Sequence, residues 1–183
     1  MKLIESILAD AAAIAAVRRD IHAHPELCFE EHRTAELVAR KLTEWGIPVV
    51  RGLGGTGVVG VIKLGQSDRA IGLRADMDAL PMQELNRFAH ASKHAGKMHA
   101  CGHDGHTAML LGAARMLAQR RNFDGTVVLI FQPAEEGGGG AKVETAERLL
   151  HQIDGEELGG GAGAAAGEND DFGVDHEAVH EAQ

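Results

Sequence analysis

Aromatic residues are scarce in this sequence, which has five Phe, one Trp and no Tyr among 183 residues. A buried core must therefore rest mainly on Ala, Val, Leu and Ile, and a hydrophobic content of 44% is enough for one ordinary globular domain. The two cysteines do not suggest a disulfide framework, and Cys28 is expected to be a small buried thiol. No stretch approaches the ~18 apolar residues that a membrane-spanning helix needs, so we expect no membrane partner.

The N-terminus also lacks the pattern of a signal peptide. Lys2 precedes an Ala-rich run at residues 11–16, as a signal peptide would require. Glu5 and Asp10 interrupt what would be its apolar region, and Arg18 closes it. We therefore expect a cytoplasmic protein.

An excess of basic residues is absent as well. The formal net charge is −9, and residues 1–150 hold eighteen acidic and eighteen basic residues. The nine remaining acidic residues follow position 150, where there is no Lys or Arg. Nothing in this distribution indicates a nucleic-acid-binding surface.

Apolar periodicity and β-branched runs predict helices that alternate with strands. Helical spacing covers residues 3–23, 31–45 and 106–119, and strand-like runs cover residues 47–50, 57–64, 70–75 and 126–131. The inward face of the third helix is predicted to carry Met109, Leu110, Ala113, Met116 and Leu117. This alternation is typical of the α/β class.

The segment Met98–Thr107 concentrates side chains that bind metals, namely a thiol, three imidazoles and a carboxylate. Cys101 and His103 are two positions apart, so in an extended or turning backbone they can face the same side. A thiolate and an imidazole make a good ligand pair for zinc or a similar metal. Gly102 and Gly105 allow the tight turns that such a cluster needs. The alternative interpretation is a polar loop with an isolated thiol.

A second polar segment follows the apolar run 126–131. The run breaks at Pro133 and places Glu135 and Glu136 at the carboxyl end of the predicted strand. Two adjacent carboxylates are costly to bury without cations. A metal removes this cost, because one carboxylate can bind the ion while the other accepts a proton from water. The alternative is a pair of solvated loop carboxylates.

These two segments belong to a set of four that resembles the M20 family of metallopeptidases. The resemblance is to its amidohydrolase branch, which includes hippurate hydrolases, N-acyl-amino-acid deacylases and auxin-conjugate hydrolases. The four segments are HPELCFEEHRT at 24–34, GLRADMDALP at 72–81, GKMHACGHDGHT at 96–107 and FQPAEEGGGGA at 131–141. The resemblance covers about residues 1–142, and it implies part of a zinc-peptidase-like catalytic domain with a mixed sheet flanked by helices.

The resemblance also implies a site for two divalent metal ions, with zinc, manganese, cobalt and nickel as candidates. Cys101 and His103 resemble the first two metal ligands of the branch, and Glu136 resembles the third. Glu135 resembles the general base, which deprotonates water for attack on an amide carbonyl and then returns the proton to the leaving amine. The implied substrate is an N-acyl amino acid or a similar small amide.

Asp76 and Asp78 stand two apart at the end of the predicted strand 70–75 and can face the same way. The wider family has a histidine ligand in the place of Asp76, which the amidohydrolase branch and this sequence lack. Asp78 is expected to hold a metal ligand or a neighbouring backbone group, with a plain turn or helix-cap role as the open alternative. Asp104 is expected to cap a helix, and His106 to be structural.

The composition changes where the resemblance ends. A domain of residues 1–145 is expected to precede a low-complexity acidic tail of residues 146–183 that is disordered. The family's two further histidine ligands and its lid domain, which also mediates dimer contacts, have no counterpart in the sequence. We therefore expect a truncated or frame-shifted copy with impaired hydrolysis, weak metal binding and non-specific self-association. The alternative is a catalytically inactive remnant that acts as a binding or interaction protein.

Two other motifs match functional patterns without the required context. Gly52–Gly57 has the glycine spacing of a dinucleotide-binding turn, but it leads into the strand-like run 58–62, which favours a hairpin or connection. His176–His180 matches the zincin pattern, but three residues follow it, too few for the third ligand. Neither motif predicts a site.

Overall fold

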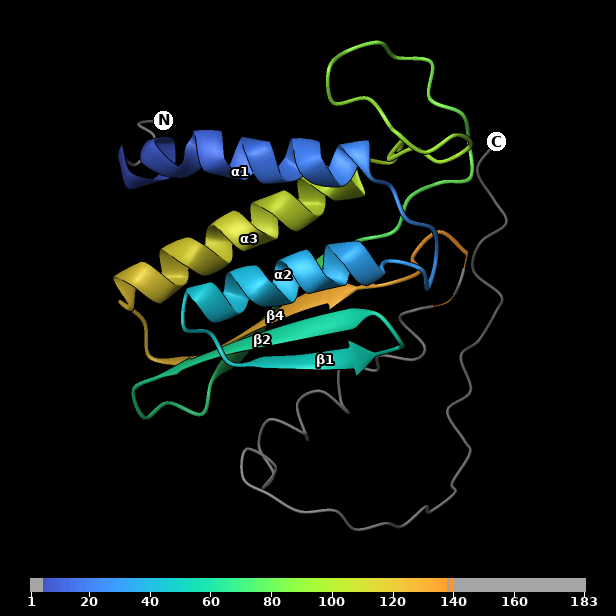
Figure 1. The fold of residues 1–183 in the computed structure, drawn as a ribbon. Coiled ribbons are helices and arrows are strands. Elements are labelled where there is room, and N and C mark those ends of the chain that lie inside the picture. The colour runs from blue at the N-terminus through green and yellow to red at the C-terminus, as the bar shows by residue number, and fades with distance from the viewer. Residues whose placement is uncertain (1–4, 138, 140–183) are drawn as a thin grey trace, which may run out of the picture.

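The computed structural model describes residues 5–137 and 139, and Figure 1 shows the elements that they form. In chain order these are α1 (Glu5–Ala23), α2 (His32–Glu44), β1 (Val49–Leu53), β2 (Gly57–Leu64), β3 (Ala70–Asp76), α3 (His103–Arg120) and β4 (Gly125–Gln132). The predicted α/β class is confirmed. The largest differences from the predicted boundaries are in β1, which runs from Val49 to Leu53, and in α3, which already begins at His103.

The four strands form one mixed sheet in the order β1-β2-β4-β3. β2 runs antiparallel to both β1 and β4, whereas β3 runs parallel to β4. Parallel neighbours need a crossover connection, and α3 supplies it between β3 and β4. The last residues of these two strands, Asp76 and Gln132, are partners in the register, so their carboxyl ends meet at one edge of the sheet.

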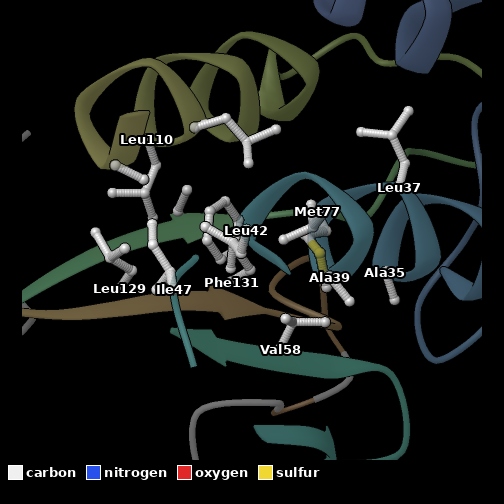
Figure 2. Packing of buried hydrophobic residues seen from close by; sticks show 14 of the residues in the cluster. Ala35, Leu37, Ala39, Leu42, Ile47, Val58, Met77, Leu110, Leu129 and Phe131 are labelled. Atoms are coloured by element: carbon white, nitrogen blue, oxygen red, sulfur yellow. The ribbon is translucent and has the colours of Figure 1, made fainter. Parts of the chain in front are cut away.

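The helices lie over one face of the sheet, and the main core fills the space between these two layers (Figures 1 and 2). Val58 of β2 is paired with Phe131 of β4, and both are buried toward the helices. Figure 2 shows Leu42 of α2 and Leu110 of α3 extending toward Leu129 and Phe131. Alternate residues of β2 and β4 face the opposite side, as the pleat of a strand requires.

Gly60 in β2 allows α2 to lie close to the sheet. A Cβ atom at this position would lie 3.1 Å from Leu42 Cδ1 and 3.2 Å from Ile47 Cγ2. These distances are shorter than the optimal separation of two carbon atoms, about 3.5–4.0 Å. Leu42 and Ile47 are both buried, so a larger residue at position 60 would displace them.

The predicted inward face of α3 is only partly correct. Leu110 is buried as expected, but Met109 is 64% exposed, and the other buried apolar residues of the helix are Ala108, Leu111 and Ala114. α3 packs on the sheet and also along α1, where Gly112 lies against the side chain of Ile14. A periodicity pattern assumes one buried face, whereas this helix packs against α1 and α2 as well as the sheet.

The glycine-rich segment Gly52–Gly57 connects β1 to β2, which pair antiparallel. The prediction of a hairpin is therefore confirmed, and the helix that a dinucleotide-binding turn would open does not follow it. The predicted boundary at residue 145, the acidic tail 146–183 and the motif His176–His180 lie outside the described residues. Within residues 5–137, none of the helices is long and apolar enough to cross a bilayer.

Phe131 tests the core, because its side chain is fully buried beneath α2 and α3. We expect Phe131→Ala to lower the free energy of unfolding by about 3–5 kcal/mol, from lost apolar burial and the cavity left behind. Urea denaturation followed by circular dichroism measures this change. Ile71→Ala is the matched control, since Ile71 is exposed on β3 and should change stability by less than about 0.5 kcal/mol.

Candidate metal centre

The predicted site residues converge where β3 and β4 end and α3 begins. Asp76 ends β3, Asp78 follows it, His103 is the first residue of α3, and Glu135 and Glu136 follow β4. Because parallel strands present their carboxyl ends at one edge, loops and a helix N-terminus come together there. Segments more than fifty residues apart in sequence thus form a single polar site.

Cys101, His103 and Glu136 form a compact group of possible metal ligands. One ligand atom from each lies within 4.8 Å of the other two. The distance from His103 Nε2 to Glu136 Oε1 is 3.8 Å. Gly102 has φ +90°, a backbone conformation that L side chains rarely adopt, and it turns the chain between the thiol and the imidazole.

Asp78 orients two members of this group. His103 Nδ1 lies 2.9 Å from the backbone oxygen of Asp78 and 3.2 Å from its Oδ1. Both oxygens only accept, so Nδ1 carries a proton, and in the neutral ring Nε2 keeps a free lone pair. The backbone N–H of Glu136 donates to Asp78 Oδ2 at 2.8 Å. This arrangement of a carboxylate behind a histidine is typical of metal sites.

Asp78 is ionised despite being buried. Burial raises the pKa of its carboxyl, but hydrogen bonds from His103, from the backbone of Glu136 and from Cys28 outweigh burial and hold the pKa well below its usual range. The Cys28 thiol donates to Asp78 Oδ2 at 3.2 Å. Burial and this contact with Asp78 raise the pKa of Cys28 to about 11, so the half-buried thiol stays a protonated donor.

The charges around the ligand group fit a cation. A hydrogen bond to Glu136, desolvation and the negative charges of Glu136, Glu135 and Asp76 raise the pKa of the Cys101 thiol to about 11. Burial lowers the pKa of His103, but Asp78 and Asp76 outweigh it and raise the pKa above its ordinary value. Among the described residues, Glu136 Oε1 is buried without a hydrogen-bond partner. A buried acceptor that faces a thiol and an imidazole lone pair suits a divalent metal.

Glu135 is placed beside the group but faces solvent more. Its side chain is 42% exposed, and its Oε2 lies 3.9 Å from His103 Nε2. The side chain of Glu136 is 21% exposed, so the two adjacent carboxylates have different surroundings. The geometry allows one of them to bind an ion and the other to exchange protons with water.

Glu31, which the sequence analysis assigned no role, supports the turn after β4. Its carboxylate is fully buried and accepts hydrogen bonds from the backbone N–H of Ala134 at 2.9 Å and from the hydroxyl of Thr56. Ala134 has φ +52°, which is unfavourable for a residue with a Cβ, so this bond helps to hold the turn. In the sequence, the position of Glu31 within the segment 24–34 was the available sign that it has a role. An acid just before a helix is normally solvated, so its burial was not expected.

Asp104 does not cap α3, contrary to the prediction. The N-cap residue is Gly102, and it makes no side-chain capping bond. Asp104 is buried and instead accepts hydrogen bonds from Arg18 Nε at 3.1 Å and His22 Nδ1 at 3.0 Å. These donors come from α1, so tertiary packing determines the role of this aspartate. His106 also has a defined partner, since its Nδ1 lies 2.6 Å from Asp76 Oδ1.

The sequence of this chain matches a known protein family. A model of peptidase family M20/M25/M40 matches residues 72–181, more than half of the chain. The chain belongs to peptidase family M20. The resemblance found in the four sequence segments is thereby confirmed, while the roles of the individual M20 site residues stay predictions.

Three M20 relatives show how far the similarity extends. The hippurate hydrolase of Campylobacter jejuni is 53% identical over 154 residues, which cover 84% of this chain and 40% of that protein. The N-acyl-L-amino acid amidohydrolase of Geobacillus stearothermophilus is 46% identical, over 74% of this chain and 36% of that protein. The solved YXEP protein of Bacillus subtilis, described as a dinuclear metal-binding peptidase from the M20 family, has a TM-score of 0.73 and 45% identity, over 78% of this chain and 41% of that one. The chain spans about 40% of the length of these relatives.

Asp78→Asn tests the low pKa of this carboxyl. Because the pKa is lowered by folding, the stabilisation is complete above the unfolded value of about 3.9 and is lost as pH falls toward the folded value. We expect the thermal unfolding temperature of the native chain to fall more steeply than that of Asp78→Asn below about pH 4. Asp68→Asn, at an exposed carboxyl, is the control and should follow the native profile. Identical acid profiles for all three proteins would contradict the assignment.

Proposed function

We propose that this chain carries part of the active site of a metal-dependent amidohydrolase that acts on N-acyl amino acids or similar small amides. The observation that supports this most directly is the convergence of Cys101, His103 and Glu136 around the unpaired Glu136 Oε1. Membership in peptidase family M20 gives the reaction class, which is hydrolysis of an amide or peptide bond.

Cys101, His103 and Glu136 would hold a divalent cation, with His103 binding through Nε2 and Asp78 fixing its ring. When bound, such an ion would polarise the substrate carbonyl and lower the pKa of water. A thiolate and an imidazole favour zinc, while manganese, cobalt and nickel remain candidates. YXEP is a dinuclear protein, and the proposal accordingly includes two ions in the complete active site.

Glu135 would act as the general base. Its exposed carboxylate can accept a proton from the attacking water as the water oxygen bonds to the amide carbon. When the carbon–nitrogen bond breaks, protonated Glu135 would return that proton to the leaving amine. Glu136, held by its backbone bond to Asp78, keeps its carboxylate turned toward Cys101 and His103.

The substrate class rests on the relatives. The printed names of two of them, hippurate hydrolase and N-acyl-L-amino acid amidohydrolase, both describe cleavage of an acyl group from an amino acid. We propose the same bond for this chain.

Glu135→Gln and Glu136→Gln separate the two proposed roles. We expect Glu135→Gln to lower kcat/KM for N-benzoyl- and N-acetyl-amino acids at least about 100-fold, because the amide cannot accept a proton, and to leave metal content unchanged. Glu136→Gln should lose bound metal, which elemental analysis after dialysis measures. Equal metal loss in both variants would contradict the division of roles.

The same measurements distinguish hydrolysis from the alternative of a binding protein. Metal bound by the native chain without turnover of any N-acyl amino acid would favour an inactive remnant. Turnover that survives in Glu135→Gln would identify a different base. The exposed acid Glu36 provides the matched control, since Glu36→Gln should leave both turnover and metal content unchanged.

A further inference from the structure

A second group of possible metal ligands lies beside the first and contains no thiol. Asp76, His103 and His106 each offer one ligand atom, and these atoms lie within 4.8 Å of one another. We infer that Asp76 and His106 form, with His103, an alternative position for a divalent cation, one that suits ions preferring oxygen and nitrogen ligands. This inference rests on the proposed function, in which His103 is a metal ligand.

Asp76 is the fixed part of this position. It ends β3, its side chain is 7% exposed, and its backbone oxygen accepts a hydrogen bond from Thr107 Oγ1 at 2.9 Å. Its Oδ1 lies 2.6 Å from His106 Nδ1, and its Oδ2 lies 3.1 Å from Arg74 Nη1. The carboxylate is therefore held between a strand and a helix, with one oxygen directed toward the histidines.

His103 is common to both groups, and its geometry makes them alternatives. Nδ1 is bonded to Asp78, so Nε2 is the remaining ligand atom. Nε2 lies 3.7 Å from Asp76 Oδ1 and 3.8 Å from Glu136 Oε1, and is thus almost equidistant from the two carboxylates. The single lone pair of this nitrogen binds one ion at a time. Asp76 and Glu136 do not belong to one ligand group among the described residues, so an ion held through His103 is expected to take only one of them as its carboxylate ligand.

His106 can change from a hydrogen-bond donor to a metal ligand if the proton of its ring moves from one nitrogen to the other. Its Nδ1 donates to the Asp76 carboxylate, which only accepts, so the neutral ring has its lone pair on Nε2. The side chain is 47% exposed, and solvent can therefore exchange the proton between the two ring nitrogens. With the proton on Nε2, Nδ1 becomes available to the ion. The ring stacks against His103 with centroids 5.5 Å apart.

The two positions should prefer different ions. The group with Cys101 suits soft or borderline ions such as Cd²⁺ and Zn²⁺, whereas one carboxylate and two imidazoles suit Mn²⁺. The Arg74 guanidinium offsets part of the charge of Asp76, so the position at Asp76 should bind more weakly than the thiolate position. When a soft ion and Mn²⁺ compete for the chain, we therefore expect the soft ion at the position with Cys101 to bind more tightly.

The test uses Cd²⁺ and Mn²⁺ separately on the native chain and on two sets of variants. Cd²⁺ is followed by the ultraviolet charge-transfer absorption of a cadmium–thiolate bond, and Mn²⁺ by the loss of the electron paramagnetic resonance signal of the free ion. We expect His106→Gln and Asp76→Asn to weaken Mn²⁺ binding at least about tenfold and to keep the Cd²⁺ absorption. Cys101→Ser should do the reverse, and His103→Gln should weaken both.

Three controls distinguish a lost metal ligand from a loss of folding or a general loss of metal binding. His32→Gln, at an exposed histidine at the start of α2, should bind both ions like the native chain. Circular dichroism of each variant establishes that it is folded, and His106→Gln is informative even where Asp76→Asn is unstable, because His106 is half-exposed. Cd²⁺ added to the Mn²⁺-loaded native chain should release Mn²⁺, since both ions need His103.

Three results would overturn the inference: Mn²⁺ affinity unchanged in both His106→Gln and Asp76→Asn, Mn²⁺ binding lost in Cys101→Ser, or both ions held by one chain at the same time. A Cd²⁺ absorption that persists in Cys101→Ser would instead contradict the ligand set of the proposed function. The two hypotheses therefore fail through different variants.

Discussion

The arrangement of the candidate metal centre depends on the carboxylate of Asp78. Its two oxygens hold the ring of His103 at the start of α3 and the backbone of Glu136 after β4. The Asp78 backbone itself continues β3, so three separate segments are joined at one residue. A buried carboxylate with so many donors is stable as an anion, and removal of the carboxyl group would leave those donors unpaired.

Two further buried acids support the same site from other directions. Glu31 holds the turn that presents the two glutamates, and Asp104 connects the first turn of α3 to α1. Each accepts hydrogen bonds from distant parts of the chain, and neither belongs to the ligand group around Cys101. Precise ligand positions require this kind of supporting layer, because a site held only by its own loops is too loose.

The α/β class, most element boundaries and the meeting of Cys101, His103 and Glu136 were predictable from the sequence. Strand ends and glycine-flanked polar segments are local patterns, and the order of strands and helices brings them to one edge. The roles of Glu31 and Asp104 were not predictable, because their donors lie tens of residues away in sequence. The exposure of Met109 was missed for a related reason, since no local periodicity reveals a second helix packed alongside.

The missing side chain at Gly60 has a consequence beyond local packing. By admitting Leu42 and Ile47, it sets the spacing between the helical layer and the sheet. The segment that carries Glu31 leads directly into α2, so this spacing also determines whether the carboxylate of Glu31 reaches Ala134. A single added methyl group in the middle of β2 would thus act on the proposed metal ligands through a displacement of α2, without touching any of them. The proposed metal affinity of this chain would then depend in part on how closely two layers of the fold approach each other.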